Sequence, residues 1–279
     1  LFDMYKPKES SKEMLNRAVS LAKADLMSEM VYEFTELQGL MGCYYAKALG
    51  ESNEVATAIK EQYLPDGEDS ALPSTPMSAI VAMSLKLDTL IGLFSINQIP
   101  TGSRDPFALR RAVNGLIRIT KEHNLEFDIV ETLTLLSKDY AEFDMLKLEA
   151  FFLERLRQYF KVNPSIVEAV LASGERELLS IGKKIDALEA MVKSEGFSES
   201  FSTFKRVANI TKDIDMSNEF RVDVKLFEAK AEEALFARYS EVSSSKYDSY
   251  EEDVDALFAL KRELDKFFDD VMVNAEDEK

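Results

Sequence analysis

The sequence has 279 residues, and its 34 Lys and Arg side chains stand against 51 Asp and Glu, giving a formal net charge of −17 at pH 7. This charge excludes a general attraction to nucleic acid or to an anionic membrane, but it does not exclude a local basic site. Hydrophobic residues make up 46% of the chain, with only 10 Gly and 7 Pro, which indicates a soluble, helix-rich protein of one large domain or two.

Cys43 is the only cysteine, so no internal disulfide can form and no zinc site can rest on thiolates. This usage is typical of a reducing compartment, and we therefore expect a cytoplasmic protein. Residues 1–14 begin with Leu1 and lack the basic and apolar regions of a signal peptide. We expect the chain to be an internal piece of a longer protein.

The first part of the chain is predicted to be helical over residues 12–49, because apolar residues recur at helical spacing. A second, short helix is expected from Asn53 to Gln62, with Ser52 or Asn53 as its N-cap. Residues 65–76 contain three prolines and a glycine, and they predict a loop.

The next predicted helix, from about Met77 to Phe94, is the most apolar stretch of the chain. Lys86 and Asp88 interrupt it, so we interpret it as a buried helix of a soluble protein and expect no contact with a membrane.

A basic helix is predicted after Asp105, because an N-cap carboxylate followed by Pro106 is a typical helix start. At about 100° per residue, one face collects cations and the opposite face collects apolar residues. The basic face consists of Arg110, Arg111, Asn114, Arg118 and Lys121, with Arg104 just before the helix. Arginine suits phosphate because its planar fork donates two hydrogen bonds at once. Taken alone, the spacing favours a solvated face or internal ion pairs over a phosphate site.

The rest of the chain, from His123 onward, gives further helical segments and no alternating strand pattern. A second small basic cluster, Lys205, Arg206, Asn209 and Lys212, shares one side of a predicted helix. Here a solvated face is an equally good interpretation. We predict an all-α, multi-domain protein.

No catalytic or metal site is predicted in the sequence. His123 is the only histidine, and no catalytic motif surrounds it, which argues against a Ser-His-Asp or Cys-His site. A metal cluster that needs several histidines cannot form. Neither GxxxxGK[ST] nor GxGxxG occurs. Carboxylates are abundant, but the sequence marks out no pair of them.

The segment DTLIGLFSINQIPTGSRDPFALRRAVNGLIRI, residues 88–119, resembles the β subunit of bacterial heterotetrameric glycyl-tRNA synthetase. The stretches at 22–46 and 59–76 are similar to the same subunit upstream of this motif, and FKRVANI and ALKRELDKFFDDVMV are similar to its C-terminal part. These landmarks occur in family order, so the resemblance covers nearly the whole chain and is weakest between 123 and 190.

The resemblance implies an α2β2 enzyme in which the α subunit holds the aminoacylation site, with ATP and Mg²⁺, while the β subunit binds and positions tRNA-Gly. It implies no cofactor in this part of the chain. It also implies three regions: an incomplete HD-like helical domain at 1–122, a helical middle region at 123–195, and an anticodon-binding helical bundle at 196–279 that is also incomplete.

The metal-binding histidines of active HD phosphohydrolases are not present, and the resemblance implies that Gln62 and Ser84 stand where relatives carry His and Asp. The HD-like region is therefore expected to act as a scaffold or RNA-contact surface without metal. The residues expected to contact tRNA are Arg104, Arg110, Arg111, Arg118, Lys205, Arg206 and Asn209. Some of these arginines could instead hold the preceding loop by pairing with Asp88 or Asp105.

Two other functions stay open. The chain could be an assembly module that docks the α subunit without recognising tRNA directly, and Met27, Met30 and Met41 suit such a surface, although core filling is the plainer interpretation. A residual metal-dependent phosphohydrolase is the third hypothesis, and the single histidine argues against it.

Overall fold

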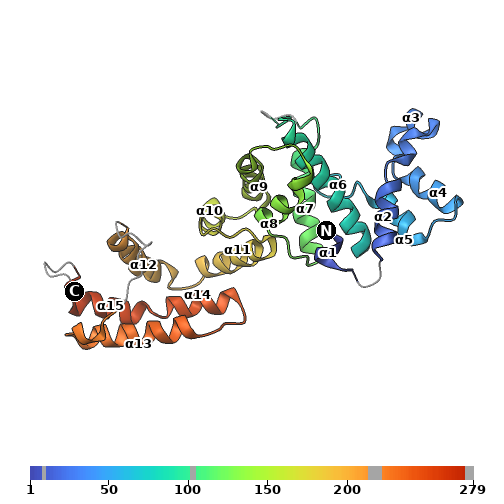
Figure 1. Cartoon of the computed structure of the whole chain (residues 1–279). Coiled ribbons are helices and arrows are strands. Elements are labelled where there is room, and N and C mark those ends of the chain that lie inside the picture. The colour runs from blue at the N-terminus through green and yellow to red at the C-terminus, as the bar shows by residue number, and fades with distance from the viewer. Residues whose placement is uncertain (8–10, 101–104, 213–221, 274–279) are drawn as a thin grey trace. The chain divides into compact units, whose positions relative to one another are not determined.

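The computed structural model describes residues 1–7, 11–100, 105–212 and 222–273, and helices dominate them (Figure 1). These described residues contain no β-strand and a single isolated β-bridge, between Asp128 and Glu177. The all-α prediction is confirmed. The chain divides into two compact units, Leu1–Gly182 and Lys183–Lys279.

The first unit begins with short helical elements and continues with longer ones. They are α1 (Phe2–Tyr5), α2 (Lys12–Leu21), η1 (Ala24–Met27), α3 (Glu29–Glu33), η2 (Thr35–Leu37), α4 (Leu40–Ala48), α5 (Asn53–Glu61), α6 (Pro76–Ser95), α7 (Leu109–Glu122), α8 (Ile129–Leu136), η3 (Ser137–Asp139), α9 (Met145–Tyr159) and α10 (Pro164–Ala172). The division between the units falls within α11 (Leu178–Val192).

The helix predicted over residues 12–49 is broken into five short elements, α2, η1, α3, η2 and α4. The Ser28 hydroxyl caps α3 by accepting from the backbone N–H of Val31. The Asp25 carboxylate is buried and accepts from the backbone N–H groups of Gly39, at 2.6 Å, and Gly42, at 3.2 Å. Gly39 has a φ of 78°, which favours glycine, and this turn starts α4 in a new direction.

The next two helices confirm the sequence-based boundaries closely. Ser52 is the N-cap of α5, as expected, and its hydroxyl accepts from the N–H of Val55 at 3.2 Å. Thr75 caps α6, with Pro76 at its first position. Among the described residues, α6 is the one helix long and apolar enough to cross a membrane. Most of it, however, is buried inside the protein.

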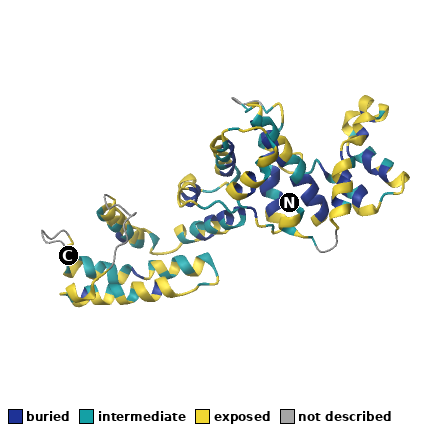
Figure 2. Cartoon of the chain, in the orientation of Figure 1, coloured by how far each residue is buried: buried dark blue, intermediate teal, exposed yellow. Residues whose placement is uncertain are grey.

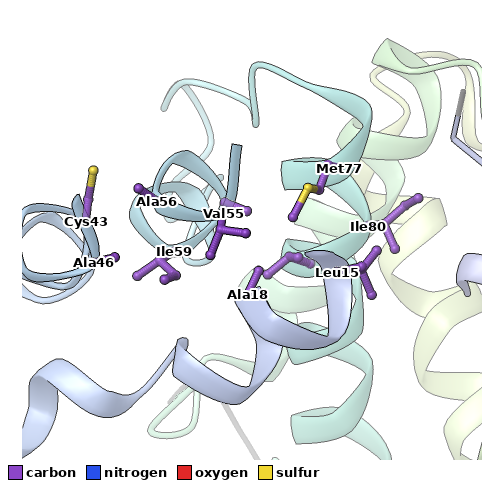
Figure 3. Close-up of a cluster of buried hydrophobic side chains, with 11 residues drawn as sticks. Leu15, Ala18, Cys43, Ala46, Val55, Ala56, Ile59, Met77 and Ile80 are labelled. Atoms are coloured by element: carbon purple, nitrogen blue, oxygen red, sulfur yellow. The ribbon is translucent and has the colours of Figure 1, made fainter. Parts of the chain in front are cut away.

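A hydrophobic cluster joins α2, α4, α5 and α6 (Figure 3). It combines large side chains such as Ile59 and Met77 with alanines, including Ala18 and Ala56, which are fully buried. The small side chains let the helix backbones approach one another closely. Buried residues continue along α6 into α7 (Figure 2), where Leu109, Val113, Leu116 and Ile117 lie on the buried face as the sequence predicts.

The predicted start of α7 at Asp105 and Pro106 is wrong, because the helix begins at Leu109. Ala108 adopts the left-handed conformation, with φ of 58°, which separates the Asp105 turn from the helix. Asp105 nevertheless serves the helix start: its carboxylate accepts from the backbone N–H groups of Arg110, at 3.3 Å, and Arg111, at 3.4 Å.

The second unit holds the rest of α11 and four further helices. They are α12 (Phe197–Thr211), α13 (Lys230–Ser244), α14 (Tyr250–Phe258) and α15 (Lys261–Asp270), with the short η4 (Val224–Leu226). A turn at Ala259 and Leu260 separates α14 from α15. Few side chains of α12–α15 are buried, among them Ala231, Val242 and Leu260 (Figure 2).

Candidate nucleic-acid interface

In the first turn of α7, Arg111 forms an ion pair with Asp105, which precedes the helix. Arg111 Nε lies 3.7 Å from Asp105 Oδ2, and the Arg111 side chain is exposed while that of Asp105 is mostly covered. One of the two pairings expected as alternatives to RNA contact is therefore present. The other expected partner, Asp88, accepts instead from the Tyr140 hydroxyl at 2.5 Å.

The middle of the same face holds the loop that precedes α6. Arg118 donates from Nη1 to the carbonyl of Gly67 at 2.8 Å and from Nη2 to the carbonyl of Ser70 at 2.7 Å. One turn further, His123 Nε2 lies 2.9 Å from the Pro73 carbonyl oxygen. The predicted loop at 65–76 is thus covered by the basic helix, and the fork of Arg118 is already occupied.

The end of the face meets aromatic rings rather than solvent alone. Lys121 Nζ lies 5.7 Å from the ring centroid of Tyr159 and 5.6 Å from that of Phe160. These are cation–π distances, and a cation there keeps some freedom to bind an anion as well. Of the predicted basic face, Arg111 and Lys121 are the exposed residues, while Arg110 and Arg118 are half-buried.

The basic cluster on α12 is presented differently. Lys205, Arg206 and Asn209 are all exposed. Arg206 places its guanidinium carbon 4.1 Å from the ring centroid of Phe268 on α15, so the charge stands on an aromatic surface. Within the part of the chain that the structure describes, Lys205 and Asn209 have no side-chain hydrogen bond or ion pair.

The opposite side of α12 is fixed to α14 and α15 by specific contacts. Thr203 is buried and donates to Asp265 at 2.6 Å, and Lys261 donates to the other carboxylate oxygen of Asp265 at 2.5 Å. Phe204 stacks on Phe258 with ring centroids 4.8 Å apart. Lys261 therefore holds the pKa of the Asp265 carboxyl below its usual value, and Thr203 adds to this effect. These contacts fix α12 against α14 and α15 and leave Lys205 and Asn209 exposed.

A third surface is apolar. Met27 is 89% exposed and Tyr32 is 82% exposed, although both lie on packed elements, η1 and α3. The apolar surface, as we call it, consists of the exposed large side chains of residues 26–49: Leu26, Met27, Met30, Tyr32, Phe34, Tyr44 and Leu49. The interpretation of Met27 and Met30 as core residues is therefore wrong, because both side chains are exposed. Met41 is half-buried.

Sequence comparison identifies the family. The sequence model of the family described as "Glycyl-tRNA synthetase beta subunit" matches residues 3–172. The chain belongs to this family. A relative from Helicobacter pylori (strain G27) named "Glycine--tRNA ligase beta subunit" is 43% identical over 278 residues. Relatives of the same name from Nitratidesulfovibrio vulgaris and Shewanella pealeana are 39% and 37% identical.

These alignments cover 97%, 94% and 97% of this chain, respectively, but only 40%, 40% and 41% of the relatives. The chain thus spans about two fifths of the length of the glycyl-tRNA synthetase β subunits that it matches.

In this member of the β-subunit family, the predicted site residues fall into two groups. Arg110, Arg111 and Arg118 share α7 in the first unit, while Lys205, Arg206 and Asn209 share α12 in the second. Arg104 lies outside the described residues. No group of three or more His, Cys, Asp or Glu side chains among the described residues could hold a metal ion. Lys23 and Lys86, which the sequence interpretation did not single out as site residues, line a cavity beside the start of α7. Their signal in the sequence was only a charge inside an apolar helical pattern.

Proposed function

We propose that the chain is a tRNA-binding part of a glycine-tRNA ligase β subunit and helps to position tRNA-Gly for aminoacylation. Family membership supports the reaction, and the exposed face of α12 carries the proposal of RNA contact. The chemistry with ATP and Mg²⁺ would take place on an α subunit in a cytoplasmic α2β2 assembly. This part of the chain would need no cofactor.

The face of α12 suits RNA because its cations are exposed and one is supported by an aromatic ring. Lys205 and Arg206 would meet backbone phosphates, while Asn209 could donate to or accept from a base edge. The Phe268 ring limits the freedom of Arg206, so less entropy is lost when its guanidinium meets a phosphate. Residues 196–279 would act as the anticodon-binding domain, and 1–122 as an HD-like scaffold followed by a middle region at 123–195.

The face of α7 would contribute less to RNA contact than the sequence suggests. Arg118 already donates to two carbonyl groups, and Arg111 lies near Asp105. A phosphate would therefore have to compete with these partners, whereas Lys205 has none among the described residues.

The test is a salt titration of tRNA-Gly binding to the 279-residue chain. We compare the double variant Lys205→Ala/Arg206→Ala with Arg110→Ala/Arg111→Ala and with the matched control Lys230→Ala/Lys246→Ala, which removes the same charge from exposed positions of the second unit. The first pair is expected to weaken binding and to lower the slope of log affinity against log salt by about 1 to 2. Equal effects of the first pair and the control would show that α12 is no interface.

The apolar surface favours a second function, docking of the α subunit. Met27 and Tyr32 are exposed, and Glu29, Glu33 and Glu36 are exposed acidic residues of the same segment. An α subunit with an apolar patch bordered by basic residues would complement this surface. Met27→Glu/Tyr32→Glu should abolish co-elution with the α subunit and preserve the helical circular dichroism. Retained co-elution would contradict docking at this surface.

A further inference from the structure

A cavity of about 380 Å³ opens in the first unit where the start of α7 meets the middle of α6 and the segment that follows α5. Its volume is in the range of small-ligand sites. The residues that matter for its chemistry are Lys23, Gln62, Tyr63, Lys86, Phe107 and Arg111.

Lys86 is the innermost cation of this cavity. Its ammonium donates to the Tyr63 carbonyl at 3.0 Å, which fixes the end of the side chain. Gly115 on α7 makes room for it, since a Cβ at that position would lie 2.8 Å from Lys86 Cε. Burial lowers the pKa of Lys86 to about 8, and repulsion from Lys23 adds to this effect while Asp66 opposes it. The fold thus keeps a cation where desolvation disfavours it.

Two further cations line the same cavity. Lys23 Nζ lies 4.1 Å from the ring centroid of Tyr63. Arg111 also lines the cavity, and its pairing with Asp105 uses Nε at 3.7 Å, which is long for a hydrogen bond. Glu36 and Asp66 are the carboxylates of the lining. Among the described residues, no carboxylate forms an ion pair within 4.0 Å of Lys23 or Lys86. Asp25 and Asp88 act on Lys23 only from longer range, where they oppose the lowering of its pKa by burial.

Gln62 lies in the wall of the cavity, behind the cations. It is 1% exposed, and its Nε2 donates to the carbonyls of Ala22 and Ile59, which fixes the orientation of the amide. The Oε1 atom is buried and has no hydrogen-bond partner among the described residues. Because this atom has almost no accessible surface, the Gln62 amide is a fixed part of the cavity wall and not a ligand contact.

We propose that this cavity binds a phosphate group of a ribonucleotide, with Lys86, Lys23 and Arg111 as the cations. The rings of Tyr63 and Phe107 line the same space and offer apolar surface to the sugar or base. The inference rests on the proposed function, because that function supplies RNA as the source of the nucleotide. It adds an RNA contact in the first unit to the one proposed on α12 in the second.

The test is calorimetric titration of the whole chain with 5′-AMP, adenosine, inorganic phosphate and a short single-stranded oligoribonucleotide without terminal phosphates. We compare the native sequence with Lys86→Met, Arg111→Gln and the control Lys47→Met, an exposed lysine outside the cavity. Binding of 5′-AMP or the oligonucleotide should fall about tenfold or more in Lys86→Met, as expected for loss of a charged hydrogen bond, and stay unchanged in the control.

The ligands distinguish the sources of phosphate. Tighter binding of the oligonucleotide indicates a backbone phosphate, tighter binding of 5′-AMP indicates a terminal one, and adenosine should bind most weakly. Equal affinity of the native protein and a folded Lys86→Met variant, or no saturable binding of any phosphate probe at millimolar concentration, would overturn the inference.

Binding of tRNA-Gly to the same proteins separates this inference from the proposed function. If the native chain binds tRNA-Gly but no small phosphate probe, the phosphate site in the cavity is refuted and the proposed function is not. A chain that binds 5′-AMP through Lys86 but not tRNA-Gly refutes the proposed function alone.

Discussion

The guanidinium of Arg118 donates a hydrogen bond of 2.7 Å to the carbonyl oxygen of Ser70, 48 residues earlier in the chain. A second bond, 2.8 Å long, reaches the carbonyl of Gly67. A residue that the sequence presents as a phosphate ligand thus fastens a loop. This relationship has a direct consequence for mutagenesis.

We expect Arg118→Ala to lower the free energy of unfolding by about 1 to 2 kcal/mol, since two hydrogen bonds from a charged donor to partly exposed carbonyls are lost. The loop at 65–75 should also become more sensitive to proteolysis. Urea unfolding and limited proteolysis measure the two effects. Arg111→Ala is the matched control and should change both by little. A loss of tRNA affinity in Arg118→Ala with an unchanged loop would instead indicate direct RNA contact.

A second prediction concerns Arg206 and the ring beneath it. Phe268→Leu keeps an apolar side chain but removes the aromatic face 4.1 Å from the guanidinium. We expect tRNA-Gly affinity to fall about two- to fivefold, because an exposed cation–π contact is worth about 0.5 to 1 kcal/mol. The measurement is a double-mutant cycle with Arg206→Ala. Additive effects would mean that Phe268 does not position Arg206.

A third prediction concerns Asp25, whose carboxylate is 2% exposed and accepts from the N–H groups of Gly39 and Gly42. Asp25→Ala leaves both donors without a partner inside the protein, so we expect a loss of about 2 to 4 kcal/mol in urea unfolding. Asp25→Asn retains a neutral acceptor and should lose roughly half as much. Equal stability of Asp25→Ala and the native protein would contradict a structural role for this carboxylate.

The fourth prediction is a pH dependence caused by Lys86. Its pKa is about 8 in the folded protein and 10.5 in the unfolded chain, so between these values the unfolded state binds more protons. The free energy of unfolding therefore rises with pH in this window, by up to roughly 2 to 3 kcal/mol from this group. Lys86→Met should flatten the rise, whereas Lys47→Met should leave it unchanged.

This pH experiment is best confined to pH 8 to about 9.5, because other groups act in the opposite sense at higher pH. Burial raises the pKa of Tyr5 to about 12, so the unfolded state loses its phenol proton first and stability falls above pH 10. Lys23 has a pKa lowered by desolvation and contributes a residual rise in both variants. An identical slope in Lys86→Met and the native protein would contradict the prediction.

Local signals made part of the fold predictable. Ser52 marks a helix start that depends only on neighbouring residues, and the structure confirms it. The helix expected from about Met77 is also present and begins at Pro76, in the last position assigned to the loop. Asp105 and Pro106 carry a similar signal, but α7 starts at Leu109 because Ala108 turns into the left-handed region. The Asp105 carboxylate still accepts from backbone N–H groups in the first turn of α7, although the N-cap position is occupied by Ala108.

Long-range contacts explain why the candidate site was predicted only in part. The exposed face of α12 follows from helical spacing, so Lys205, Arg206 and Asn209 were found together. The partners of Arg118 lie in a loop that spacing along its own helix does not indicate. Lys86 interrupted an apolar pattern, and its place beside Tyr63 and Gly115 depends on the packing of α6 against α7.

The Asp25 carboxylate also bears on the rate at which a partner could associate with the apolar surface. Its bonds to Gly39 and Gly42 join positions 14 and 17 residues apart, so the segment that carries Met27 and Tyr32 is a loop already closed at its base. The entropy of closing that loop is lost during folding and not at the moment of association. A partner would therefore meet a prearranged surface, and its association rate should depend on collision and orientation rather than on ordering of the segment.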